Sequence, residues 1–569
     1  IFKKGKIVLK FGIYRSLEFI SSIFVCVVFL YITTVNWKFF NHSKQGFDVP
    51  IAILEKIDKK SLLNLAKSSL IREKIKKNEL NKRMNTSIST FGELKASGYQ
   101  PKSIKSELRD NLISNIQAGR PSFPGMHGYE HTVIPQLERA ILSKHNINLL
   151  GLRGQGKTRI ARLMVNLLDE YIPYIAGSEM NDDPFQPISR FARDLMAEKG
   201  DNTPIAWLHR NDRFAEKLAT PDVTVADLIG DIDPIKAASL KLSYADDRVI
   251  HFGMIPRANR CIFVINELPD LQARIQVALF NMLEEGDVQI RGFKLRLPLD
   301  VHFVFTANPE DYTNRGSIVT PLKDRIGSQI LTHYAPNIHI AKQITQQETE
   351  QLDQRLCKVH VPELAKDILE QIAFEARDSE YIDLKSGVSA RMSITAYENL
   401  VSTAERRGLL NHEKETTVRY SDLLGVIPSM IGKMELVYEG EQEGSAVVAE
   451  HLIQKATKTL FLTSFPKIEK LKKEDQETAY DEVLQWFIDA DSFELLDEGS
   501  EKAHAKALMA IKPLQKLVQT YCPKVPKEDL AFHMEFVLWA LAEFKQLSKK
   551  RTAAGLSFND MYDSFLTGL

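Results

Sequence analysis

The pattern of hydrophobic and polar positions predicts two kinds of structure along the chain. Short apolar runs, rich in β-branched and aromatic residues, indicate buried parallel strands at Ile147–Leu150, Cys261–Ile265 and Val301–Thr306. A glycine-rich loop follows the first of these strands, and helical periodicity then extends from Thr158 to about Tyr171. A strand, a loop and a helix in this order are typical of an α/β fold with a parallel sheet.

These patterns divide the chain into five segments. A polar, helical segment over residues 84–122 precedes an α/β core over residues 123–335. The strand signals then fade, and amphipathic periodicity predicts an α-helical lid over residues 336–432 and an α-helical C-terminal region over residues 433–569. Residues 1–83 form a segment of a different kind.

This first segment contains an uncharged run, Phe19–Trp37, with basic residues on both sides. The run has the length of a marginal signal anchor or membrane-spanning helix. The segment begins at Ile1 and is rich in Lys, Asn, Ile and Ser, whereas a more ordinary sequence opens at Met84. We therefore expect residues 1–83 to be an upstream extension of the reading frame, and the alternative is a genuine membrane anchor. The expected location is the cytoplasm, or a membrane if this segment is made.

Charge is distributed unevenly along the 569 residues, which carry 74 basic and 74 acidic side chains in total. Residues 1–83 hold 17 basic and six acidic side chains, so residues 84–569 hold 57 and 68 and are acidic overall. Binding to a nucleic-acid backbone needs clustered basic side chains, so no nucleic-acid partner is expected. The four cysteines lie far apart without a CxxC pair, which argues against a disulfide framework or a zinc ribbon and fits a reducing compartment.

The glycine-rich loop satisfies the P-loop pattern G-x-x-x-x-G-K-[ST] in full. Its candidate nucleotide-binding residues are Gly151, Gly154, Gln155, Gly156, Lys157 and Thr158. The glycines let backbone N–H groups surround a phosphate chain, and Lys157 can reach the β- and γ-phosphates of ATP. The Thr158 hydroxyl can bind Mg²⁺. The sequence therefore predicts a site for ATP and Mg²⁺.

The second predicted strand ends in a polar pair, Asn266 and Glu267. In P-loop ATPases this strand end holds Mg²⁺ through an aspartate, and a following glutamate polarises the attacking water. Glu267 is thus the candidate catalytic base, and Asn266 is the candidate metal residue. Asn266 is neutral, so its hold on the metal or on the water shell of the metal is expected to be weak.

Three further polar residues are candidates for catalysis. Asn308 follows the third predicted strand, where it could hold the attacking water or the γ-phosphate. Arg325 and Arg391 are isolated cations whose default interpretation is a solvated surface or an ion pair.

Residues 123–400 resemble an AAA+ ATPase of the helix-2-insert clade, and they are most similar to the ATPase subunit I of magnesium chelatase and to MoxR-like proteins. The resemblance is carried by the P-loop, by GMIPRANRCIFVINELPDL, by MLEEGDVQIRGFKLRLPLDVHFVFTANPED and by PLKDRIG. It implies an insert around Asp227–Asp233 and a β-hairpin over Val288–Leu297, which is also a hairpin by pattern. The departure from the family is Asn266, which puts the hydrolysis rate and the Mg²⁺ dependence in doubt more than ATP binding.

The resemblance also implies roles for the polar residues and an assembly. Asn308 would be the sensor-1 residue, Arg325 an arginine finger that acts on the ATP of a neighbouring subunit, and Arg391 the sensor-2 residue of the lid. A ring, expected to be a hexamer, follows from an arginine finger of this kind.

Three functions remain open from the sequence. The first is a MoxR-like motor that remodels or matures a client protein, and the second is the ATPase subunit of a metallochelatase that inserts Mg into a tetrapyrrole. Both would work with a separate von Willebrand A-type protein, because the motif D-x-S-x-S is not found in this chain. The third is a non-catalytic nucleotide-binding scaffold, which Asn266 keeps open. A σ54-type activator is disfavoured because the GAFTGA loop is absent.

Overall fold

The computed structural model describes residues 86–243, 246–290, 296–309, 317–349, 356–468, 478–490 and 493–561. The apolar run Phe19–Trp37 lies outside the described residues. Within the described ranges, no helix combines the length and the apolar character that crossing a membrane requires.

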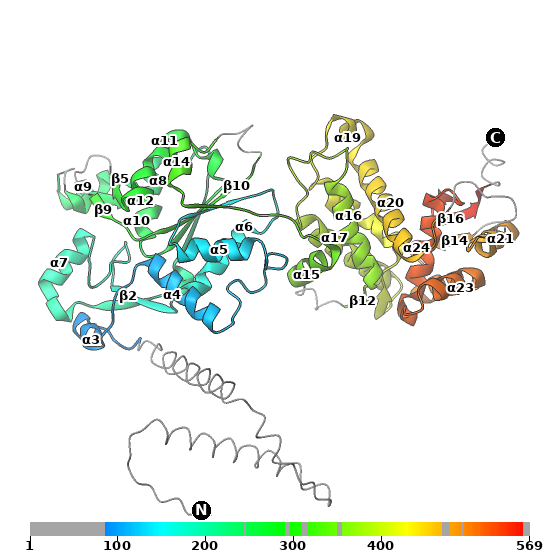
Figure 1. The fold of residues 1–569 in the computed structure, drawn as a ribbon, viewed down its shortest axis with the longest axis horizontal. Helices are drawn as coiled ribbons and strands as arrows, with labels where there is room; N and C mark the ends of the chain where they lie inside the picture. The colour runs from blue at the N-terminus through cyan, green and yellow to red at the C-terminus, as the bar shows by residue number, and fades with distance from the viewer. Residues whose placement is uncertain are drawn as a thin grey trace, which may run out of the picture. The chain divides into compact units, whose positions relative to one another are not determined.

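A five-stranded parallel sheet forms the centre of the α/β core (Figure 1). Its strands, in spatial order, are β11 (Ser328–Leu331), β1 (Ile147–Leu150), β10 (His302–Ala307), β7 (Ile262–Asn266) and β4 (Phe214–Leu218). The three strands predicted from apolar runs are therefore confirmed, and the structure places them side by side in the order β1, β10, β7. Since all five strands run in the same direction, their carboxyl ends meet at one edge of the sheet.

Both faces of this sheet are buried, which explains the continuous apolar runs. Val264 of β7 and Val304 of β10 face one hydrophobic core, whereas Phe263 and Phe305 face the other. The first core is completed by α4 (Ile104–Gln117), α5 (Val133–Leu142) and α6 (Lys157–Leu163). The second is completed by α8 (Val225–Leu228), α10 (Met254–Arg257), α11 (Ala273–Ala278), α12 (Phe280–Glu284) and α14 (Thr320–Arg325). Figure 1 shows these two groups of helices on opposite sides of the strands.

The helix predicted from Thr158 to about Tyr171 is too long. Helix α6 ends at Leu163, a 3₁₀ turn continues over Met164–Leu167, and Tyr171 begins a strand instead. This strand, β2 (Tyr171–Ile175), pairs antiparallel with β3 (Ile205–His209), so pairing with a distant segment overrides the local helical pattern.

Two small hairpins extend from the core. Strands β5 (Gly230–Ile232) and β6 (Ile250–Phe252) pair antiparallel, and α9 (Pro234–Leu240) lies between them in sequence, where the insert is expected. The predicted hairpin over Val288–Leu297 is confirmed in its strands, because β8 (Asp287–Gln289) pairs with β9 (Arg296–Pro298). Its turn residues, Arg291 and Gly292, lie outside the described residues.

The remainder of the described chain is mainly helical and has one hydrophobic core, whose buried residues extend from Ala365 to Phe558. The longest helices around this core are α15 (Ile338–Thr349), α16 (Glu363–Arg377), α17 (Arg391–Leu410), α20 (Ser445–Ser464) and α24 (Leu530–Glu543). Shorter ones are α18 (Ile427–Ile431), α19 (Tyr438–Glu443), α21 (Asp481–Asp489), α22 (Glu501–Ala510) and α23 (Lys512–Tyr521). The first helix of the chain that the structure describes is α3 (Phe91–Ala96). Helix α7 (Arg190–Lys199) follows β2 in the α/β segment of the sequence and is largely exposed.

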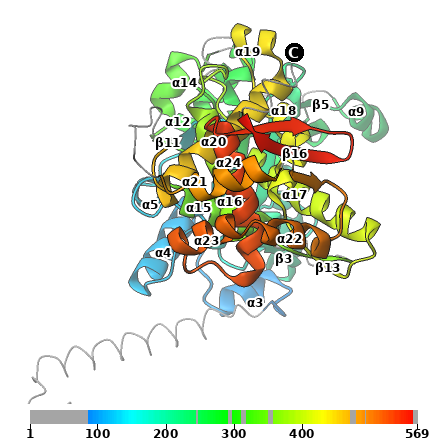
Figure 2. The ribbon, with the colours of Figure 1, turned by 90° about the vertical axis from the view of Figure 1, so that its right-hand side faces the viewer.

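The C-terminal region also contains a small antiparallel sheet that the sequence analysis did not predict. Its strands are β14 (Phe493–Leu496), β16 (Gly555–Asp560) and β15 (Leu547–Arg551), in this spatial order. The sheet packs on α24 through contacts such as that of Phe558 with Trp539 (Figure 2). Strand β15 is polar along most of its length, so it carries no apolar alternation by which it could be predicted.

Candidate functional site

A cavity of about 1200 Å³ opens at the carboxyl edge of the parallel sheet, between the sheet and the helical region. Nine of the predicted site residues line it: Gly154, Gln155, Gly156, Lys157, Thr158, Asn266, Glu267, Asn308 and Arg391. Gly151 lies just before this group, at the end of β1, where its N–H donates to the Ala307 carbonyl. The volume is large enough for a nucleotide.

The P-loop joins β1 to α6 through backbone conformations that favour glycine. Gly154 has a φ of 71°, and a Cβ atom added there would lie 2.1 Å from the Ser389 hydroxyl oxygen and 2.8 Å from the Ala390 nitrogen. Ser389 and Ala390 directly precede Arg391, the first residue of α17. The absence of a side chain at Gly154 therefore lets the start of the lid helix approach the P-loop.

Lys157 is held at the mouth of the P-loop by oxygen atoms. Its Nζ lies 2.6 Å from Oδ1 of Asn308 and 2.9 Å from the Leu152 carbonyl, and it also donates to the Gly151 carbonyl. Asn308 follows β10, which lies next to β1 in the sheet. The predicted P-loop lysine and the predicted sensor-1 residue are thus in direct contact.

Glu267 stands at the end of β7 in an uncommon conformation. Its φ of 55° and ψ of 49° place it in the left-handed region, which a residue with a side chain seldom adopts. The Glu267 N–H donates to the Thr306 hydroxyl at 3.2 Å, and the chain then turns into a 3₁₀ helix that begins at Leu268. Backbone strain of this kind is concentrated at functional sites.

Asn266 is fixed between two neighbouring strands. Its Oδ1 accepts a hydrogen bond from the Thr306 hydroxyl of β10 at 3.0 Å, and its Nδ2 donates to Oε1 of Glu216 at 2.6 Å. Glu216 lies in β4 and forms an ion pair with Arg162 of α6, with Nη2 and Oε2 2.9 Å apart. Glu216 and Arg162 also line the cavity.

Sequence reasoning missed Glu216. Strand β4 is half-buried and lacks an apolar run, so neither the strand nor its carboxylate stands out in the sequence. The place of Glu216 beside Asn266 can be recognised only once the pairing of β4 with β7 is known.

The helical region contributes ion pairs and aromatic contacts around the cavity. Arg153 of the P-loop pairs with Glu435, and its carbonyl accepts a hydrogen bond from the Tyr334 hydroxyl at 2.9 Å. The guanidinium of Arg377 lies 4.2 Å from the centre of the Tyr334 ring. The hydrogen bond from Ser386, together with the charge of Arg153, lowers the pKa of the Glu435 carboxyl. These contacts fasten the P-loop to the helical region, and the sequence alone did not single them out.

A buried carboxyl group also faces the cavity from α16. Burial raises the pKa of Glu370, and its Oε1 accepts a hydrogen bond from the Thr345 hydroxyl of α15 at 2.5 Å.

Arg325 is absent from the described lining of the cavity in its own chain. It lies at the end of α14, where its Nε is 2.7 Å from Oε2 of Glu284, and its guanidinium is 5.0 Å from the centre of the Phe280 ring. The structure therefore does not bring Arg325 to the P-loop of the same chain.

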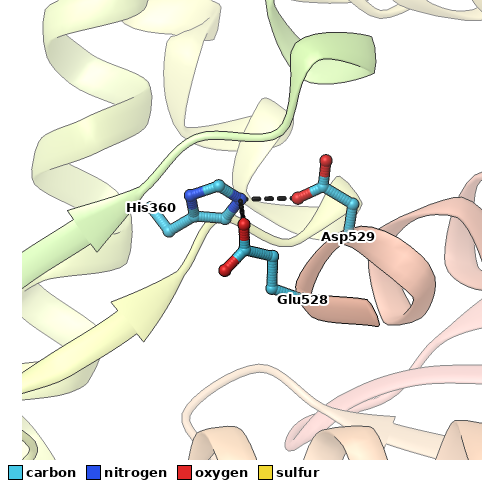
Figure 3. Close-up of side chains that lie close together, drawn as sticks. All are labelled: His360, Glu528 and Asp529. Carbon is cyan, nitrogen blue, oxygen red and sulfur yellow. Dashed lines mark hydrogen bonds and ion pairs between the residues drawn. The ribbon is translucent and has the colours of Figure 1, made fainter. Parts of the chain in front are cut away.

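A separate group of possible metal ligands lies in the helical region (Figure 3). The Nε2 atom of His360, in β12 (Lys358–His360), is 2.5 Å from Oδ1 of Asp529 and 4.0 Å from Oε1 of Glu528. Both acidic residues directly precede α24, so these contacts join β12 to the start of that helix.

No family model matches the sequence, and no curated protein matches it. The solved structures to which the chain is similar include NtrX from Brucella abortus in complex with ADP. This match has 13% identity and a TM-score of 0.30, and it covers 86% of this chain and 73% of that chain. Hsp104 with ATPγS and FITC casein matches with 13% identity, 59% and 52% coverage and a TM-score of 0.33. The complex between subunits BchI and BchD of magnesium chelatase matches with 18% identity, 56% and 98% coverage and a TM-score of 0.29.

The class of the fold follows from the sheet and the site of this chain. A five-stranded parallel sheet carries a P-loop after β1, the strand between β11 and β10, and polar residues at the ends of β7 and β10. A helical region follows the sheet in sequence. This is an α/β P-loop fold.

Proposed function

We propose that this chain is an ATP-binding and ATP-hydrolysing AAA+ motor, similar to MoxR-like proteins and to magnesium chelatase subunit I, that remodels or matures a partner protein. The observation that carries the proposal is the contact between Lys157 and Asn308 at the carboxyl edge of the sheet, with Glu267 in the same cavity. A P-loop, a polar residue on the neighbouring strand and a carboxylate in one cavity are the components that ATP hydrolysis requires.

In this proposal the backbone of Gly154–Gly156 surrounds the phosphate chain, and the positively charged ammonium group of Lys157 contacts the β- and γ-phosphates. The ammonium group of Lys157 already lies among three oxygen atoms, so a phosphate oxygen would take the place of a carbonyl partner. Asn308 would keep the lysine in position and contact the γ-phosphate.

Glu267 would orient the attacking water and accept its proton. The water oxygen forms a bond to the γ-phosphorus, the bond from that phosphorus to the bridging oxygen breaks, and ADP leaves with the electron pair. The hydroxyl of Thr158 would supply an oxygen ligand, which is the kind of ligand that Mg²⁺ prefers. A bound Mg²⁺ would neutralise negative charge on the phosphates. Arg391, at the start of the lid helix, would contact the phosphates from the other side of the cavity.

The proposal includes a ring, which we expect to be a hexamer. Arg325 lies away from the cavity of its own chain, as an arginine finger that completes the site of a neighbouring subunit would. A separate von Willebrand A-type protein and a client protein would complete the system.

ATP binding and phosphate release by the purified protein test the proposal. Lys157→Ala should abolish nucleotide binding, whereas Lys199→Ala, at the end of α7, serves as the matched control for a lost lysine. Glu267→Gln should bind ATP and release no phosphate. Unchanged ATP affinity in a folded Lys157→Ala protein would refute the site. If the wild type binds MgATP but shows no turnover, alone or with proteins captured by it, the nucleotide-binding scaffold is the better description.

Capture of partners by a Glu267→Gln protein loaded with ATP tests the proposed role in remodelling. Recovery of a von Willebrand A-type protein without a tetrapyrrole-binding subunit would support the MoxR-like function. Recovery of a tetrapyrrole-binding subunit would support the metallochelatase instead.

A further inference from the structure

The end of β7 carries an amide, Asn266, at the position where a P-loop ATPase normally has a carboxylate for Mg²⁺. Both groups of the amide are already engaged, because Oδ1 accepts from Thr306 and Nδ2 donates to Glu216. Asn266 therefore offers a metal no negative charge, and its one oxygen already accepts a hydrogen bond.

We propose that Glu216 of β4 supplies the carboxylate for Mg²⁺ in this cavity and that Asn266 positions it. The inference rests on the proposed function, since it concerns the metal that accompanies ATP. Asn266 holds Oε1 of Glu216 at 2.6 Å, which is the distance of a strong hydrogen bond to a charged acceptor. The carboxylate that is absent from the end of β7 is thus provided by β4, the neighbouring strand.

The position of Glu216 in the sheet supports this role. Glu216 is paired with Val264 in the register of β4 and β7, and Val264 and Asn266 lie two residues apart on one face of β7. This face packs against α6, because Val264 and Ile160 of α6 belong to the same hydrophobic core. Glu216 and Asn266 therefore lie on the side of the sheet from which the P-loop helix presents its residues.

The ion pair with Arg162 places Glu216 beside the other predicted Mg²⁺ ligand. Oε2 of Glu216 is 2.9 Å from Nη2 of Arg162, and Arg162 follows Thr158 by four residues on α6. Residues four apart lie on the same face of a helix, so Thr158 and the carboxylate of Glu216 face the same side of α6. All three residues line the cavity.

The remaining carboxylates of the cavity have other positions and partners. In the described lining, acidic residues other than Glu216 and Glu267 come from the helical region: Glu348, Glu370 and Glu435. Glu348 pairs with Arg159 of α6, Glu435 pairs with Arg153 of the P-loop, and Glu370 accepts a hydrogen bond from Thr345 of α15. Because Glu267 is assigned to the water, Glu216 is the sheet carboxylate that remains for the metal.

Metal-dependent nucleotide binding tests this role without relying on turnover. A fluorescent ATP analogue is titrated against Glu267→Gln protein at increasing free Mg²⁺, and bound Mn²⁺ is followed by electron paramagnetic resonance in a parallel series. Adding Glu216→Gln should raise the Mg²⁺ concentration for half-maximal binding by roughly ten- to hundredfold. The affinity measured in EDTA should stay unchanged.

Two further variants separate a metal carboxylate from an ion pair that only fastens β4 to α6. Combining Glu216→Gln with Asn266→Asp exchanges the amide and the carboxylate. The Mg²⁺ concentration for half-maximal binding, called the midpoint below, should then return toward the value of the parent Glu267→Gln protein. Arg162→Gln removes the competing cation and should leave the midpoint unchanged or lower it. If Glu216→Gln unfolds the protein, Glu216→Asp keeps the charge on a shorter side chain and should still raise the midpoint.

The proposal is overturned if the midpoint is insensitive to position 216, or if Arg162→Gln raises it as much as Glu216→Gln does. Failure of the parent protein to bind nucleotide at any Mg²⁺ concentration is a different result, because it refutes the proposed function itself.

Discussion

Lys157 and Asn308 lie 151 residues apart in sequence, yet the Nζ of the lysine is 2.6 Å from Oδ1 of the asparagine. The contact joins the P-loop after β1 to the end of β10, which is the strand beside it in the sheet. The same strand also contacts Glu267, because the Glu267 N–H donates to the hydroxyl of Thr306 in β10.

Replacing Asn308 with alanine should impair hydrolysis far more than nucleotide binding. In the proposed mechanism the Asn308 amide positions the charge of Lys157 for the transition state. The backbone of the P-loop would keep its contacts to the phosphates in the variant. We expect turnover to fall by about a hundredfold, a typical cost of losing one preorganised polar group at a reacting centre. Phosphate release and ATP affinity, measured with Asn202→Ala as the surface control, check this. An equal loss of affinity and turnover would assign Asn308 to ground-state binding.

Replacing Arg325 with alanine should abolish hydrolysis, because the proposed arginine finger of the neighbouring site is lost. ATP binding should remain intact, because Arg325 pairs with Glu284 away from the cavity of its own chain. Loss of an arginine finger costs about a thousandfold or more in turnover. Arg274→Ala, at an exposed position of α11, is the matched control.

The position of Arg325 in a ring is tested by mixing subunits. Arg325→Ala and Glu267→Gln should each abolish hydrolysis for a different reason, so mixed rings should contain some interfaces with both intact residues and regain activity. Mass spectrometry of the mixture shows whether mixed rings form. If they form and remain as inactive as each variant alone, the arginine does not act between subunits.

Glu107 and Arg213 form a buried ion pair whose loss should destabilise the α/β core. Both Nη atoms of Arg213 lie 2.7 Å from the two carboxylate oxygens of Glu107, and the two side chains are 1% and 3% exposed. Glu107→Gln leaves a buried guanidinium without its counter-charge, which costs about 3–5 kcal/mol of unfolding free energy.

Denaturant unfolding measures this cost, and an exposed ion pair provides the control. The partners Lys95 and Asp201 are 48% and 69% exposed, so Asp201→Asn should change the free energy of unfolding by less than about 1 kcal/mol. Similar effects of the two substitutions would show that burial does not set the strength of the Glu107 pair.

His302 should make the stability of the core depend on pH. Burial in β10, assisted by the charge of Lys105, lowers the pKa of this histidine from 6.5 to about 3. The unfolded chain therefore binds a proton below pH 6.5 that the folded chain refuses until the pH falls to about 3. The stability that neutral His302 supports is complete above pH 6.5 and is lost as the pH falls, at up to about 1.4 kcal/mol per pH unit.

Unfolding curves of the wild type and His302→Leu at several pH values between 5 and 7.5 check this prediction. The free energy of unfolding should fall less steeply with decreasing pH in the variant, because leucine does not titrate. Parallel pH profiles would show that His302 is protonated to the same extent in both states.

The local part of the site could be predicted from the sequence. The P-loop is a continuous motif whose glycine conformations and helix start depend on residues close together in the chain, and β1, β7 and β10 are apolar runs buried on both faces. The polar residues that directly follow these strands could then be placed at one edge of the sheet, because parallel strands end together. The eight predicted residues of the P-loop and of the ends of β7 and β10 line one cavity for this reason, and Arg391 of α17 also lines it.

What only the tertiary structure decided are the contacts between distant segments. Glu216 meets Asn266 because β4 pairs with β7, yet β4 is half-buried and has no apolar pattern of its own. Strand β2 replaces the end of a predicted helix, and polar β15 becomes a strand, because each gains hydrogen bonds from a partner strand elsewhere in the chain. The spacing of apolar residues indicates which side of a segment is buried. The strand that a segment pairs with, and the opposite charge that a buried side chain meets, depend on contacts between distant residues. These contacts form only when the chain folds.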